Sequence, residues 1–244
     1  LSEQHRIVKI LDSAFAKIEA LRANAQQNFQ NTKDFFQASL KQELSPKQGW
    51  ESKRLNEICE VKDGTHDSPK YVDDGIPFVT QKNITAKGFD IQDTRKITLS
   101  DHEKFYKRSN VEYGDILISM IGANRGMSCL VDVRDTFSIK NVGLVKQRDT
   151  IKQRYLLYYL QSPISAKYVA DASNGGAQEF IGLTALRAFP ILFPKNSEEQ
   201  QTIVEKLDAL SERCRAMEEN YRQTITHCNA LKQALLTKAF NGEL

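Results

Sequence analysis

The sequence lacks the motifs from which common nucleotide-dependent and hydrolytic active sites are built. It has no Pro-Pro pair, which the N/D-P-P-Y/F motif of a DNA adenine methyltransferase needs to hold its target amine. Neither a G-x-G-x-x-G cradle nor a G-x-x-x-x-G-K-[ST] phosphate loop occurs, and Ser, His and Asp follow no recognisable triad order. Glu60-Val61-Lys62 has the E-x-K form of nucleases, but no Pro-Asp pair precedes it, so we interpret it as a plain strand. The sequence therefore predicts neither a catalytic site nor a cofactor in this chain.

Cysteines are few, and long apolar runs are missing. The four cysteines form no C-x-x-C pair and no histidine cluster has zinc spacing, so we predict no metal site and reduced thiols in a cytoplasmic protein. No stretch approaches the apolar length of a membrane span, and the N-terminus does not resemble a signal peptide. The first residue is Leu rather than Met, so we expect either a piece of a longer chain or missing first residues.

The positive charge is small and unevenly placed. The 244 residues carry a net charge of +3. Residues 45–195 hold 22 Lys and Arg against 18 Asp and Glu, a net of +4, which leaves −1 for the rest. This surplus favours a polyanionic partner for the middle segment, although four charges could also arise by chance.

The two ends of the chain repeat each other at an offset of 196 residues. Such internal repeats commonly mark equivalent structural units. Because 196 is a multiple of seven, any heptad pattern keeps its phase between the copies. The matching pairs are Glu3-Gln4 with Glu199-Gln200, Ile7-Val8 with Ile203-Val204, Leu11-Asp12 with Leu207-Asp208, Ala20 with Ala216 and Asn24 with Asn220.

Both copies show a heptad spacing typical of long helices that pack side by side. We predict two helices of about 40 residues, each about 60 Å long, folded back on each other as an antiparallel coiled coil; an ordinary helical hairpin on a core is the alternative. Polar seam positions such as Asn28 and Thr32 either weaken the seam or fix its register. The main seam residues are Ile7, Leu11, Ile18, Leu21, Ile203, Leu207, Leu210, Met217, Leu231 and Leu235.

The middle segment changes character after Pro46 and Gly49-Trp50, which interrupt the helical pattern. Short β-like runs separated by turn signals predict a mixed α/β domain with a twisted, largely antiparallel sheet or partial barrel. The fold class is therefore α+β. We expect three segments, a spacer helix over 1–45, the mixed domain over 46–195 and a second spacer helix over 196–244. The β-like runs are Leu55–Val61, Ile76–Thr80, Asp115–Ile121, Ser138–Lys146, Phe180–Gly182 and Phe189–Phe193, and the helices are Ile151–Leu160 and Ser165–Ala172.

Several stretches, spread over the whole chain, resemble the specificity subunits of type I restriction–modification enzymes. Any one of them alone is a weak signal, but their combination is specific. The stretches are Gly49-Trp50-Glu51, Asp63-Gly64-Thr65-His66, Gly75-Ile76-Pro77-Phe78-Val79, Gln81-Lys82-Asn83-Ile84, Gly114-Asp115-Ile116-Leu117-Ile118-Ser119 with Gly122 and Gly126, Phe189-Pro190-Ile191 with Pro194, and Glu199-Gln200-Gln201.

The resemblance implies a non-catalytic reader of double-stranded DNA. It implies a modification (methyltransferase) subunit, which binds S-adenosylmethionine, and a restriction subunit as partners, with the helices setting the gap between the halves of a bipartite target. The usual family member has two recognition domains, whereas this chain has one. It is therefore either the second half of a longer subunit or a natural half-subunit, which we expect to form a homodimer. A coiled-coil adaptor that binds proteins instead of DNA, and a silent exchange cassette, are the alternatives.

We expect DNA contacts from polar side chains on loops, because loops can reach a groove more readily than core strands. Arg and Lys suit guanine, Asn and Gln suit adenine, and Lys, Arg, Ser and Thr suit phosphates. For each, the alternative is a solvated turn; the tyrosines of Tyr155–Tyr159 are expected in the core. The DNA-binding candidates are Thr65, His66, Lys70, Gln81, Lys82, Asn83, Asn124, Arg125, Lys140, Asn141, Asn174 and Gln178.

Overall fold

A computed structural model describes residues 2–173 and 179–244. The chain divides into two compact units, one made of residues 1–39 and 208–244 and the other of residues 40–207. The first unit contains most of two long helices, α1 (Ser2–Glu43) and α7 (Ser197–Phe240). The boundaries of these two units fall inside the helices, whereas the three segments expected from the sequence end where the helices end. The division into three segments therefore stays a prediction.

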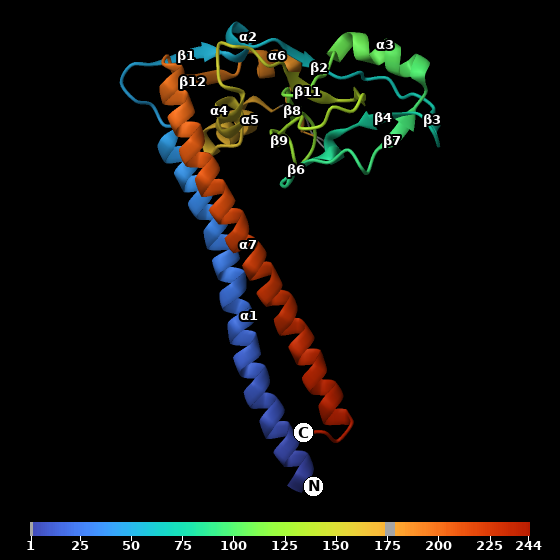
Figure 1. The fold of residues 1–244 in the computed structure, drawn as a ribbon, viewed down its shortest axis with the longest axis vertical. Helices are drawn as coiled ribbons and strands as arrows, with labels where there is room; N and C mark the ends of the chain where they lie inside the picture. Colours follow the sequence, from blue (N-terminus) through green and yellow to red (C-terminus); the bar gives the residue numbers. More distant parts are fainter. Residues whose placement is uncertain (1, 174–178) are drawn as a thin grey trace. The chain divides into compact units, whose positions relative to one another are not determined.

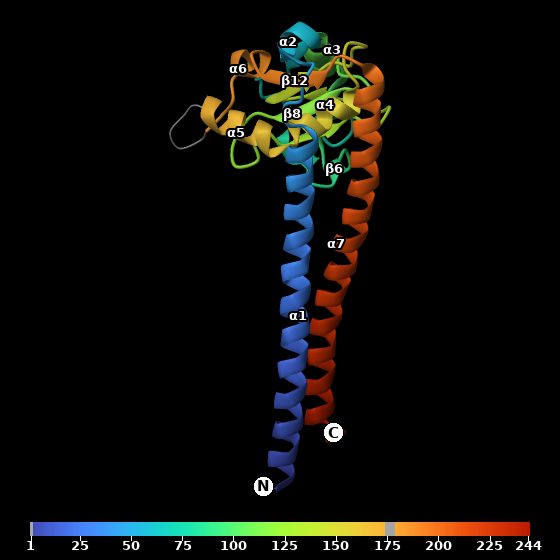
Figure 2. The ribbon, with the colours of Figure 1, turned by 90° about the vertical axis from the view of Figure 1, so that its left-hand side faces the viewer.

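The two long helices lie side by side and run in opposite directions (Figures 1 and 2). Residue numbers rise along α1 as they fall along α7. Arg6 donates to the Leu244 carbonyl at 2.6 Å. Lys232 donates to Glu19 at 2.9 Å, and the Arg222 guanidinium lies over the Phe29 ring at 5.7 Å. The antiparallel pairing expected from the sequence is thus present within one chain.

The buried face of these helices departs from the predicted heptad seam. On α1 the less exposed positions include Ile18, Ala25 and Thr32, but also Arg22 and Phe29. Ile18, Ala25 and Thr32 are seven residues apart, as are Arg22 and Phe29, so the heptad spacing holds. Beyond Ile18, however, the second position of each heptad falls one residue later than predicted. Three predicted seam residues therefore fall outside the stripe and are exposed: Leu21 (55%), Met217 (45%) and Leu231 (52%). The other predicted seam residues, Ile7, Leu11, Ile18, Ile203, Leu207, Leu210 and Leu235, are buried or half-buried.

The second unit contains two four-stranded sheets in its described part, with the orders β10-β4-β7-β3 and β2-β11-β8-β9. All pairings in them are antiparallel except that of β10 with β4. Apolar residues of both sheets, among them Val79, Leu117 and Ile139, share one core cluster. The strands are β2 (Val61–Asp63), β3 (Tyr71–Val72), β4 (Ile76–Val79), β7 (Arg95–Ile97), β8 (Ile116–Ser119), β9 (Ser128–Leu130), β10 (Ser138–Ile139) and β11 (Val142–Val145).

Smaller elements surround these sheets. Strand β1 (Trp50–Arg54) pairs antiparallel with β12 (Pro190–Pro194), so the entry and exit of the mixed domain are tied together. The tyrosines of α4 are buried, as expected, and the Tyr155 hydroxyl donates to the Leu192 carbonyl at 2.9 Å. The remaining elements are β5 (Ile84–Thr85), β6 (Gly88–Phe89), η1 (Gln81–Asn83), α2 (Leu55–Ile58), α3 (Leu99–Ser109), α4 (Gln153–Leu160), α5 (Pro163–Ala172) and α6 (Leu183–Arg187).

Three local expectations differ from the structure. In the run Phe180–Gly182, expected to be β-like, only Phe180 pairs, in an isolated bridge with Ile121. The run Leu55–Val61, expected to be β-like, begins as the short helix α2, and only Val61 enters a strand. Helix α3 was not expected at all. Its N-cap is Thr98, whose side chain accepts from the Asp101 amide, and its apolar residue Phe105 stacks on Phe78 at 5.8 Å. A capping Thr three residues before an acidic residue was the available signal for this helix.

No helix in the described part of the chain has the length and apolar character that crossing a membrane requires.

Candidate nucleic-acid interface

Two of the predicted DNA-binding segments meet at the junction of the two sheets. The chain leaves β10 and enters β11 through Lys140-Asn141, where Asn141 adopts a left-handed conformation with φ of 52°. Thr65 pairs with this turn, because its amide donates to the Ile139 carbonyl at 3.0 Å and its carbonyl accepts from the Asn141 amide at 3.1 Å. Gly64 permits this approach, since a Cβ there would lie 2.3 Å from the Ile139 carbonyl oxygen. The backbone thus fixes the two segments against each other.

Side chains from both segments extend this junction. Nδ1 of His66 lies 2.7 Å from Oδ1 of Asn141. Lys140 donates to the Ser68 hydroxyl at 2.7 Å. His66 is exposed and Lys140 and Asn141 are half-buried, whereas Thr65 is buried. Lys70, a little further along the same loop, is exposed. Three of the predicted contact residues, His66, Lys140 and Asn141, therefore share one accessible surface, and the backbone of buried Thr65 supports it.

Helix α3 adds basic residues that are not among the predicted DNA-binding residues. Lys104 donates to Asp67 at 2.9 Å, and Arg108 donates to Asp63 at 3.0 Å through Nε and at 2.6 Å through Nη2. The two basic residues are four apart and so lie on one face of the helix. Buried His102 anchors α3, because its Nδ1 lies 2.8 Å from the Ser138 hydroxyl. We call the surface formed by His66, Ser68, Lys104, Arg108, Lys140 and Asn141 the basic junction.

Charge pairing within the basic junction is reflected in the ionisation of its members. The hydrogen bond from Lys104 lowers the pKa of the Asp67 carboxyl, and the same bond raises the pKa of Lys104. Both groups stay charged at neutral pH. The pair is solvent-exposed, so it contributes little to stability, and Lys104 can exchange its partner for a phosphate at small cost.

The segment Gln81–Asn83 forms the 3-10 helix η1, and its members differ in availability. Asn83 is buried, accepts from the Thr80 amide and donates to the carbonyls of Asp90 and Asp93, each at 2.9 Å. Its side chain therefore folds the loop and is not available to a base, which corrects the expectation of a DNA contact. Gln81 is half-buried, and only Lys82 is exposed.

Arg125 is also engaged within the protein. It donates from Nε to the Ser173 hydroxyl at 2.8 Å and from Nη1 to the Gly122 carbonyl at 3.3 Å, and it forms an ion pair with Glu179. Its side chain is only 20% exposed. Its neighbour Asn124 is exposed. The structure thus makes Arg125 a brace between loops.

Two further predicted residues, Asn174 and Gln178, lie outside the described residues.

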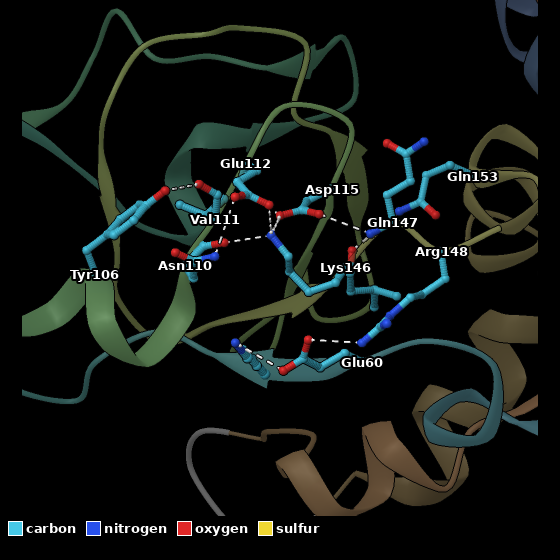
Figure 3. A network of polar contacts seen from close by, with 12 residues as sticks. Glu60, Tyr106, Asn110, Val111, Glu112, Asp115, Lys146, Gln147, Arg148 and Gln153 are labelled. Carbon is cyan, nitrogen blue, oxygen red and sulfur yellow. Dashed lines mark hydrogen bonds and ion pairs between the residues drawn. The ribbon is translucent and has the colours of Figure 1, made fainter. Parts of the chain in front are cut away.

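Asp115, in the family-like stretch that begins at Gly114, belongs to a buried polar network (Figure 3). Lys146 donates to Asp115 at 2.7 Å, to Glu112 at 2.8 Å and to the Asn110 carbonyl at 2.6 Å. Asp115 also accepts from the amides of Gln147 and Glu112. Burial lowers the pKa of Lys146, but its hydrogen bonds with Asp115 and Glu112 outweigh this and raise the pKa overall. This network ties the turn before β8 to the end of β11 and is structural.

The described residues contain no group of three or more His, Cys, Asp or Glu side chains that could hold a metal ion. The basic junction offers hydrogen-bond donors, acceptors and positive charge on an accessible surface. Such a surface suits a polyanion with readable polar edges. The fold and this surface together define a mixed α/β domain with an accessible polar surface, in a chain that also carries a pair of antiparallel helices.

Comparison with known proteins identifies the class. The family model for the type I restriction modification DNA specificity domain matches residues 47–227, so the chain belongs to this family. It is 24% identical over its whole length to the EcoBI specificity subunit of Escherichia coli, covering 57% of that protein. It is also 24% identical to the StySPI specificity subunit of Salmonella potsdam, covering 56%. The chain thus spans a little over half the length of these relatives.

Solved structures show the same fold. The HsdS subunit from Thermoanaerobacter tengcongensis matches the whole chain with a TM-score of 0.63 at 23% identity, over 59% of its own length. A chain from a structure titled for complex assembly and conformational transition of the type I R-M system matches 99% of this chain with a TM-score of 0.78, also at 23% identity. It is covered over 60% of its length. Specificity subunits are non-catalytic, so membership of this class agrees with the expectation that the chain is not itself an enzyme.

Proposed function

We propose that this chain reads one part of a double-stranded DNA target for a type I restriction–modification complex. The observation that carries the proposal is the basic junction, where predicted DNA-binding segments 75 residues apart in sequence meet on one surface. Family membership supports the same function. Catalysis, with S-adenosylmethionine, then belongs to the modification subunit, and cleavage to a restriction subunit, all in the cytoplasm.

Within the basic junction, His66, Lys104, Lys140 and Asn141 supply the groups that face DNA. Lys70 and Lys82, both exposed, extend the positive charge. Each lysine that neutralises a phosphate releases a counterion, so binding weakens steeply as salt rises. Base readout then requires the oriented donors and acceptors, and Asn suits adenine. Thr65 and Asn83 support the loops and are not among the contacts.

The test is a methylation map. The chain is co-expressed with its modification subunit in a host without DNA methylation, and methylated adenines are located by single-molecule sequencing. A recurring motif supports the proposal. If the complex forms and the DNA stays unmethylated and unbound at low salt, the reader function is refuted.

We further propose that two copies of the chain associate through their helices. The exposed residues Leu21 and Phe35 lie two heptads apart on α1, and Met217 and Leu231 lie two heptads apart on α7. In the antiparallel register of the two helices, Leu21 of α1 and Leu231 of α7 lie at about the same height along the helix pair. Exposed apolar strips of this kind mark association surfaces. A molecular mass of one chain by light scattering at micromolar concentration would argue against the dimer, and a Leu21→Glu, Leu231→Glu variant is expected to be monomeric.

A protein-binding adaptor remains the second candidate because the helices alone suffice for it. The adaptor function would be favoured if the chain captured a protein partner to the same extent at low and high salt and did not bind duplex DNA.

A further inference from the structure

One buried carboxylate orients two exposed side chains of the basic junction. Asp63 ends β2, where it pairs with Gly143 of β11, and its side chain is only 7% exposed. Its Oδ1 accepts from Nε and Nη2 of Arg108, and its Oδ2 lies 3.1 Å from Nε2 of His66. A buried carboxylate is costly unless it is paired and hydrogen-bonded. Asp63 therefore holds both partners firmly.

Arg108 is restrained at one edge and accessible elsewhere. It lies in the last turn of α3, and its side chain is 49% exposed although two of its nitrogens bond to Asp63. The guanidinium is planar and carries its donors in a rigid fork. Because the Asp63 contact fixes the plane of this fork, the nitrogen–hydrogen bonds on its other edge are held in a defined direction.

Lys104 on the same face of α3 differs in this respect. Its partner Asp67 has a side chain that is 56% exposed, and the two share a single contact. A flexible ammonium of this kind suits phosphate as a point charge, whereas a fixed planar fork suits the O6 and N7 acceptors of guanine.

We propose that Arg108 is a specificity-determining residue that reads a guanine in the major groove, and that Asp63 is its positioning residue. Asp63 also orients His66, which extends the same surface toward Asn141. This inference rests on the proposed DNA-reading function. It adds a base class, guanine, and a contact residue that lies on a helix and not on a loop.

The experiment uses the complex with the modification subunit and the motif from the methylation map. Duplex affinities are measured by fluorescence anisotropy at several salt concentrations, for the cognate duplex and for duplexes altered one base pair at a time. Variants are Arg108→Ala, Arg108→Lys and Asp63→Asn. The matched comparison is Lys104→Gln, and Asp74→Asn is the inert control, because Asp74 forms an exposed pair with Lys96.

Arg108→Ala and Arg108→Lys are expected to weaken cognate binding about tenfold or more and to remove discrimination at one G·C position. The methylation map then relaxes at that position alone. Asp63→Asn is expected to lose the same discrimination while it leaves the salt dependence unchanged. Lys104→Gln should weaken cognate and altered duplexes equally and reduce the salt slope by about one.

The proposal is overturned if Arg108→Ala binds like the wild type, or if it behaves like Lys104→Gln. Arg108→Ala changes an exposed position, so it keeps the test valid even if Asp63→Asn fails to fold. If the wild-type complex itself discriminates no duplex, the DNA-reading function fails instead, and the two failures are thereby distinguished.

Discussion

Removal of one partner from the Lys146 network should destabilise the mixed domain strongly. Asp115 is 1% exposed and Lys146 is 8% exposed, so neither charge is well solvated. Asp115→Ala leaves Lys146 with Glu112 and the Asn110 carbonyl, but without its buried counterion. Lys146→Met keeps the apolar stem and leaves Asp115 buried without a cation. Breaking a buried pair in this way costs about 3–5 kcal/mol.

That loss is a large share of a typical unfolding free energy of about 5–15 kcal/mol. With a urea dependence of about 1–3 kcal/mol per molar, the midpoint should fall by at least about 1 M. The two variants should not be additive, because the second substitution removes a charge that the first has already left unpaired. We expect a coupling energy of about 0.5–3 kcal/mol in the double variant.

The chain offers a local probe for this measurement. Trp50 is the only tryptophan in the sequence, and its Nε1 donates to Glu199 at 2.9 Å within the same unit as the network. Urea unfolding followed by its fluorescence therefore reports on that unit. Asp74→Ala, at a fully exposed side chain, is the control and should change stability by less than about 0.5 kcal/mol. Additive effects, or a loss below about 1 kcal/mol for Asp115→Ala, would refute the reasoning.

Three further predictions concern ionisation, thiol reactivity and the loop brace. The hydrogen bond from Lys146 lowers the pKa of Glu112 in the folded protein. The stability that ionised Glu112 contributes is therefore complete above its ordinary pKa of 4.5 and is lost as the pH falls through the lowered folded pKa. Glu112→Gln should flatten that part of a stability–pH profile, and an unchanged slope would contradict this. Burial raises the pKa of the Cys59 and Cys129 thiols to about 12, so iodoacetamide at pH 8 should label them only after unfolding, as mass spectrometry can check. Arg125→Ala and Glu179→Gln should impair duplex binding to a similar extent if the ion pair acts as a brace, whereas an effect of the arginine alone would indicate direct DNA contact.

The sequence was most informative where a pattern extends over many residues. The repeated ends predicted both long helices and their antiparallel direction, because an apolar stripe over many turns needs a partner. The heptad spacing is present, but its second position was placed one residue too early, because Leu21 is apolar and its less exposed neighbour Arg22 is not. Helix α3 was missed because its apolar positions are few and its basic residues resemble a solvated loop.

The candidate surface was harder to predict than the fold. The polarity of the loop around His66 was visible, but its pairing with Asn141 depends on a sheet junction between residues 75 positions apart. Asn83 illustrates the opposite error. A polar residue in a loop resembles a contact, yet its amide groups are all used to fold the chain.

The constant register between α1 and α7 limits how a spacer of this kind can change length. A residue inserted into one helix alone would shift Glu19 away from Lys232 and rotate the buried stripe. Insertions that preserve both the ion pair and the stripe must occur in the two helices together and in steps of about seven residues. One such step adds about 10 Å, which corresponds to about three base pairs of duplex. Under the proposed DNA-reading function, target spacing would therefore change in jumps of about three base pairs, through paired duplications in the two gene segments that encode α1 and α7.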